Sequence, residues 1–223
     1  MRWLFAHRFQ SFLITICALV LAYPLLRGSA VGAVTFAVLR TLVFASALLV
    51  LTKDLRWRIP ALALGAATLV SQWVVICHDA TPALEITHHA LAALLLVLAV
   101  AVTLIDIFGP KSVSRESIFA ALASYVLVAL VFAHLYCVVE IAAPRSFATP
   151  PALEGALEEP DRRFFILAYF SLVTLTTLGY GDVTPGIDTV RSLAMVEAVS
   201  GQFYMAVLIA GLVSRVATPP RLE

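Results

Sequence analysis

The feature that most constrains this chain is a series of apolar segments, each about as long as a helix that crosses a lipid bilayer. Such a helix needs about 20 predominantly apolar residues. Five segments meet or approach that length, and a sixth is interrupted by polar residues; the six are residues 9–26, 30–51, 59–77, 82–108, 118–142 and 189–216. Only 13% of the residues are charged and 61% are hydrophobic, whereas a soluble domain carries about 25% charged residues. The sequence therefore predicts an all-α integral membrane protein with six transmembrane helices.

A shorter apolar stretch, residues 164–176, cannot span the bilayer and has the length of a re-entrant helix. It follows residues 143–160, which are rich in Pro, Ala and Glu and are expected to form an exposed extracellular loop. Asp161 precedes the stretch and is expected to be the N-cap of its helix. The pattern predicts a re-entrant pore helix between the fifth and sixth spans.

The basic residues of the short loops predict the orientation of the chain. If the N-terminus is inside, most loop Lys and Arg residues lie on the cytoplasmic side, and acidic residues gather outside. We therefore expect a multi-pass protein of the cell membrane, surrounded by lipids, with both termini in the cytoplasm. The net charge of +1 gives no strong field that would attract nucleic acid.

The most informative segment is residues 176–182, Thr-Thr-Leu-Gly-Tyr-Gly-Asp. It resembles the selectivity filter of the pore-loop potassium channels, whose pattern is Thr-(Val/Ile/Leu)-Gly-Tyr-Gly, and the architecture agrees from about residue 115 to residue 215. The resemblance implies a six-transmembrane, voltage-gated-like channel, which passes K+ passively as a homotetramer. The composition rich in Ala and Leu and the compact loops indicate a prokaryotic type, and no small-molecule substrate is expected. Leu178 replaces the commoner Val or Ile and leaves the carbonyl in place.

The physics of ion dehydration explains why these residues suit a filter. A cation that leaves water needs oxygen atoms that replace its hydration shell, and rings of backbone carbonyls from four chains supply them. Gly179 and Gly181 can adopt left-handed conformations without a Cβ penalty, which lets successive carbonyls face one axis. The Thr177 hydroxyl adds the innermost ring. The predicted filter residues are Thr177, Leu178, Gly179, Tyr180 and Gly181, with K+ ions bound at the first four.

Five further residues are expected to support the filter: Tyr169, Phe170, Val173, Thr176 and Asp182. Tyr180 should point away from the axis and pack against the short helix at Tyr169 and Phe170. Val173 occupies the position at which some relatives carry a Glu behind the filter. Asp182 should raise the local cation concentration, and the C-terminal end of the short helix should favour a cation in the cavity.

Two residues of the last span are candidates for gating. Gly201 occupies the place where related channels keep a flexible glycine, and it either acts as a hinge or allows close helix packing. Glu197 is an ionisable group inside a span. It either braces the short helix through Thr174 or Thr176, tunes the cavity as a proton-sensitive group, or makes a structural hydrogen bond.

The fourth span has no Arg or Lys, so a conventional voltage sensor is not expected in the first four helices. Arg40 lies midway along the second span and needs a partner, for which Asp106, Gln72 and Glu85 are the candidates.

His88 and His89 lie near the outer end of the fourth span, with Glu85 and Asp79 close in sequence. They either form an external proton sensor or are interface histidines with structural hydrogen bonds.

The expected domains are a four-helix membrane domain at 1–108, a linker at 109–115, a pore domain at 116–218 and a cytoplasmic tail at 219–223. Two alternatives to a potassium channel are a weakly selective cation channel and a non-conducting modulatory subunit. An enzyme is not expected, because no grouping of catalytic residues converges on one face.

Overall fold

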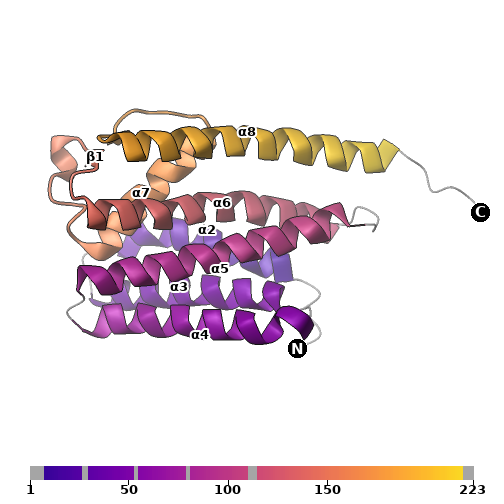
Figure 1. Ribbon diagram of the computed structural model, residues 1–223, viewed down its shortest axis with the longest axis horizontal. Coiled ribbons are helices and arrows are strands. Elements are labelled where there is room, and N and C mark those ends of the chain that lie inside the picture. Colours follow the sequence, from indigo (N-terminus) through magenta and orange to yellow (C-terminus); the bar gives the residue numbers. More distant parts are fainter. Residues whose placement is uncertain (1–7, 27–29, 53–54, 79–80, 110–114, 218–223) are drawn as a thin grey trace, which may run out of the picture.

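The computed structural model describes residues 8–26, 30–52, 55–78, 81–109 and 115–217 (Figure 1). Within these ranges the chain forms seven α-helices: α2 (Arg8–Leu26), α3 (Ala30–Leu51), α4 (Leu55–Cys77), α5 (Pro82–Phe108), α6 (Arg115–Ala142), α7 (Pro160–Leu175) and α8 (Asp188–Ala217). Most of the predicted linker and the whole predicted tail lie outside the described residues.

The described helices have the character of a membrane protein. Four segments are long and apolar enough to cross a bilayer: Val31–Leu51, Arg58–Cys77, Pro82–Phe108 and Glu116–Ala142. The segment Phe9–Tyr23 is a shorter apolar helix. The prediction of an α-helical, multi-pass membrane protein is confirmed, while six spans remain a prediction.

Helix α6 connects the two halves of the molecule. It packs along α5 and against α2 on one side, and it contacts α7 and α8 on the other (Figure 1). Small side chains let neighbouring helices approach it closely, because Ala120, Ala123, Ala129 and Ala133 are all buried. Helices α2 and α5 therefore lie against the same chain's α6, while α3 and α4 pack against α5. Helix α8 lies at the far edge of the molecule (Figure 1).

The segment before α7 is more ordered than a simple exposed loop. It contains β1 (Phe147–Ala148) and the 3-10 helix η1 (Pro151–Leu153). Strand β1 pairs antiparallel with β2 (Thr184–Pro185), which lies beyond residues 176–182. This short ladder ties the two ends of the region together.

Helix α7 begins earlier than predicted. Its N-cap is Glu159, whose side chain makes no capping hydrogen bond, and Pro160 occupies the first turn, where its missing N–H costs nothing. The prediction that Asp161 is the N-cap is wrong, because Asp161 lies inside the first turn.

Candidate functional site

The segment 176–182 leaves the C-terminal end of α7 and stays attached to it by main-chain hydrogen bonds. The amide of Thr177 donates to the Thr174 carbonyl at 3.0 Å, and that of Leu178 donates to the Val173 carbonyl at 2.9 Å. The hydroxyl of Tyr125, on α6, donates to the Leu175 carbonyl at 3.1 Å. These hydrogen bonds fix the position of Thr177 and Leu178 relative to the last turn of α7.

The backbone of the segment alternates in handedness. The φ angles of Thr177, Gly179 and Gly181 are 58°, 60° and 76°, and the residues between them, Leu178 and Tyr180, have no positive φ. Sequence reasoning predicted the two glycines but missed Thr177, because a positive φ is a genuine outlier for a β-branched residue. Strain of this kind is typical of functional sites.

The segment is uncovered on one side within the single chain. Every residue from 176 to 182 is exposed, including the large side chains of Leu178 (55% exposed) and Tyr180 (67% exposed). A Cβ atom added at Gly179 or Gly181 would meet nothing within 4 Å. The alternating backbone therefore faces open space on this surface.

Two aromatic residues of α7 have different roles from one another. The hydroxyl of Tyr169 donates to Asp182 Oδ2 at 2.8 Å, which links the helix to the outer end of the segment. Partial burial and this hydrogen bond raise the pKa of Tyr169 to about 12, so it stays a donor at neutral pH. Phe170, however, packs within the chain against Tyr136 and Phe147, with ring centroids 5.2 Å apart in both pairs.

Val173 and Thr176 make hydrogen bonds at the end of α7, Val173 through its carbonyl and Thr176 through its side-chain hydroxyl. The Val173 carbonyl accepts from the amides of both Leu178 and Gly179, at 2.9 and 3.4 Å, and its side chain is buried. The Thr176 hydroxyl donates to the Leu172 carbonyl at 2.7 Å.

Glu197 lies where α6, α7 and α8 meet and is fully buried. The hydroxyl of Tyr136 donates to its Oε2 atom at 2.6 Å, and the hydroxyl of Ser171 is hydrogen bonded to its Oε1 atom. The Ser171 hydroxyl also lies 2.7 Å from the Ala129 carbonyl. Glu197 does brace α7, but the partners predicted for it, Thr174 and Thr176, are wrong.

Gly201 is the point at which α8 crosses the end of α7. A Cβ atom there would lie 2.4 Å from the Leu175 carbonyl oxygen and 2.9 Å from Leu175 Cδ1. Close packing of α8 against α7 therefore requires a glycine at this position. This confirms the predicted role of Gly201 in helix packing. The hinge remains a prediction.

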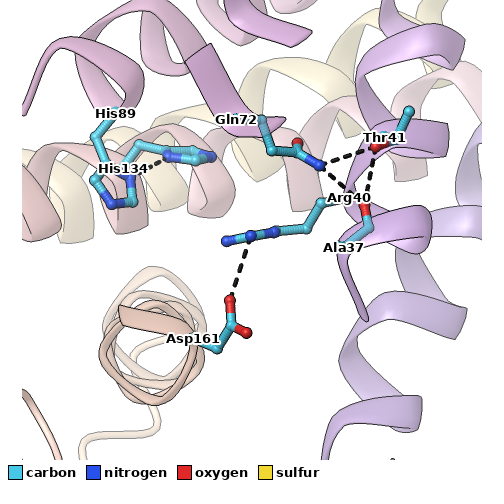
Figure 2. Close-up of polar contacts among 7 residues, drawn as sticks. All are labelled: Ala37, Arg40, Thr41, Gln72, His89, His134 and Asp161. Atoms are coloured by element: carbon cyan, nitrogen blue, oxygen red, sulfur yellow. Dashed lines mark hydrogen bonds and ion pairs between the residues drawn. The ribbon is translucent and has the colours of Figure 1, made fainter. Parts of the chain in front are cut away.

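Arg40, on α3, forms an ion pair with Asp161 in the first turn of α7, with 3.3 Å between Nη2 and Oδ1 (Figure 2). The predicted candidates are not the partner. Gln72 donates instead to the Ala37 carbonyl and the Thr41 hydroxyl, both at 2.9 Å, and Glu85 pairs with Arg163 at 2.5 Å. Residues far apart in sequence are brought together here, and local patterns carry no signal for that.

His88 and His89 are both buried. His89 Nδ1 lies 2.8 Å from His134 Nδ1 on α6, and His88 Nδ1 lies 3.0 Å from the Ser71 hydroxyl on α4. Both histidines therefore make hydrogen bonds between helices, as predicted by the interpretation that they are structural residues of an interface.

Comparison with known proteins separates the two halves of the chain. Residues 120–218 match the model of a family described as ion channel. No curated protein and no solved structure matches the chain. The matched region contains nearly all of α6, the whole of α7, the alternating segment and α8. This region of the membrane protein is similar to the ion channel family.

Proposed function

We propose that the chain is one subunit of a homotetrameric, potassium-selective channel that conducts K+ passively through the backbone carbonyls of residues 177–181. The observation that carries the proposal is the alternation in the sign of φ from Thr177 to Gly181. Alternating handedness turns successive carbonyls toward one side of the chain, which is the arrangement that can replace the hydration shell of a cation. Thr177, Leu178, Gly179 and Tyr180 bind the permeant ions, and the Thr177 hydroxyl adds the innermost ring.

The exposure of the segment supports its assembly with further copies of the chain. One chain contributes one oxygen to each level of the filter, and its own atoms leave the glycines uncovered. Helix α8 adds an apolar stripe at helical spacing, with Met195, Val199 and Phe203 exposed by 63%, 52% and 65%. In the tetramer, this stripe and the filter face the neighbouring copies and the axis.

The other elements take the places that a pore requires. Helix α6 is the outer helix and α8 the inner helix, and residues 116–218 form the pore domain. The re-entrant helix α7 ends at Leu175, two residues before Thr177, so its partial negative charge favours a cation in the cavity. Both termini are cytoplasmic, and residues 1–108 form a membrane domain that has no Arg or Lys in α5.

The test is K+ flux into liposomes that contain the purified protein. We expect K+ flux that greatly exceeds Na+ flux, and loss of the K+ flux in Gly179→Ala, because the φ of 60° becomes costly once a Cβ atom is present. Gly155→Ala is the matched control: Gly155 has a φ of 71° and open space around it, but it lies in the loop before α7. This variant should conduct like the wild type.

Other results would contradict the proposal. Equal K+ and Na+ flux would indicate a weakly selective cation channel. An assembled protein that carries no flux would indicate a non-conducting modulatory subunit.

A further inference from the structure

The first turn of α7 carries two charged side chains that are held by different helices of the α2–α5 region. Asp161 pairs with Arg40 of α3 at 3.3 Å, and Arg163 pairs with Glu85 of α5 at 2.5 Å. Two residues along a helix correspond to a rotation of about 200°, so the two side chains leave α7 on nearly opposite sides. We call these four residues the α7 clamp.

Three of the four side chains of the α7 clamp are shielded from solvent. The side chains of Arg40, Arg163 and Glu85 are 7%, 10% and 12% exposed, and that of Asp161 is 33% exposed. Arg163 is fixed further by hydrogen bonds from Nε to the Leu157 carbonyl at 2.7 Å and from Nη2 to the Glu158 carbonyl at 3.2 Å. Removal of one partner would leave the other as an uncompensated buried charge, which is strongly unfavourable.

Arg40 is also placed by the rings around it. Its guanidinium carbon lies 5.4 Å from the ring centroid of Phe36 and 5.9 Å from that of Phe164 on α7. Gln72 holds the backbone of α3 next to it through the Ala37 carbonyl (Figure 2). The arginine is therefore fixed against α7 and does not lie free along α3.

The opposite end of α7 holds the filter. The amides of Thr177 and Leu178 bond to carbonyls of the last turn, and α7 is one continuous helix from Pro160 to Leu175. A continuous helix moves as a rigid element, so a tilt imposed on its first turn also displaces its last turn.

We propose that Arg40 and Glu85 are positioning residues for the filter, and that α3 and α5 act on ion selectivity through the first turn of α7. This inference rests on the proposed function of residues 177–181. It assigns the α2–α5 region a role that needs no row of gating arginines: the region sets the position of the re-entrant helix from its outer end.

The test compares Arg40→Met, Asp161→Asn and the charge exchange R40D/D161R in the full chain, with Asp188→Asn as the control. Asp188 pairs with Arg191 at 2.7 Å, but the two side chains are 94% and 57% exposed, so loss of this pair should have little effect. The measured quantities are the ratio of Na+ to K+ permeability in liposomes and the fraction of assembled protein. A purely structural ion pair would change only the assembled fraction.

We expect each single variant to raise the permeability ratio by about tenfold or more, and the charge exchange to restore most of it. The control should keep the wild-type ratio. If the single variants do not assemble, the inference is tested by the charge-exchange variant R40D/D161R alone. Its assembled channels should then show a ratio of Na+ to K+ permeability close to that of the wild type. Wild-type ratios in the assembled single variants, or an assembled charge exchange that is no more selective than they are, would overturn the inference. Absence of K+ flux in the wild type would instead contradict the proposed function.

Discussion

The two halves of the molecule use their buried polar groups in different ways. In the α6–α8 half, hydroxyl groups hold the end of α7: Tyr125 bonds to the Leu175 carbonyl, and Ser171 and Tyr136 bond to Glu197. In the α2–α5 half, charged side chains reach out of the helix bundle and pair with the start of α7. The same short helix is thus held near one end by hydrogen bonds from hydroxyl groups and at the other end by ion pairs. Helix α7 is therefore the element that residues of both halves position.

The largest effect is expected in the α6–α8 half, at Glu197. Glu197→Ala leaves the buried hydroxyl of Tyr136 without its partner, which costs about 1–3 kcal/mol, and it removes the link from α8 to Ser171, whose hydroxyl keeps the Ala129 carbonyl. We expect a large loss of the assembled protein and a lower thermal unfolding temperature in detergent.

Glu197→Gln is the matched variant, because the amide keeps the size of the side chain and one acceptor oxygen, while its NH2 group can donate to a hydroxyl at the other position. It should assemble and unfold at a temperature closer to that of the wild type. Equal stability of the Ala variant and the wild type would show that the three-helix junction does not depend on this side chain.

A somewhat smaller effect is expected at Gly201. In Gly201→Ala the added Cβ atom would lie 2.4 Å from the Leu175 carbonyl oxygen, so α8 must move away from the end of α7. Overpacking of this kind typically costs about 1–3 kcal/mol, and we expect lower thermal stability together with weaker K+ selectivity in flux assays.

Gly211→Ala serves as the control for Gly201, because its added Cβ atom would meet the ring of Phe108, a side chain that can turn away. A Gly201→Ala variant with wild-type stability and selectivity but altered opening would favour the hinge over the packing contact.

The smallest effect is expected within the α2–α5 half, at Gln72. Gln72→Leu removes the hydrogen bonds to the Ala37 carbonyl and the Thr41 hydroxyl without touching α7. Each lost bond contributes about 1 kcal/mol, so thermal stability should fall slightly while the ratio of Na+ to K+ permeability stays unchanged. A change in that ratio would show that the hydrogen bond from Gln72 to α3 also contributes to the position of Arg40 in the α7 clamp.

Features that depend on local sequence could be predicted. Apolar length indicated the positions of the helices, and the two glycines of residues 176–182 indicated a left-handed backbone, which the structure has. Features that depend on packing between distant segments could not. The ion pair between Arg40 and Asp161 joins α3 and α7, and no pattern in the sequence around either residue indicates the other as its partner. The positive φ of Thr177 ran against the preference of its side chain.

The same limit applies to the residues around the site. Phe170 lies only a few positions before the filter, but the face of α7 that carries it is turned toward Tyr136 and Phe147. Glu197 bonds to Ser171 because of the angle at which α8 crosses α7, and an apolar pattern does not fix that angle.

The most direct measurement is a cryo-electron microscopy structure of the purified full chain in K+. We expect four copies around one axis, with the carbonyls of residues 177–180 facing that axis and ion density between them. A structure in which Gly179 and Gly181 face lipid, or lie away from any symmetry axis, would contradict this expectation.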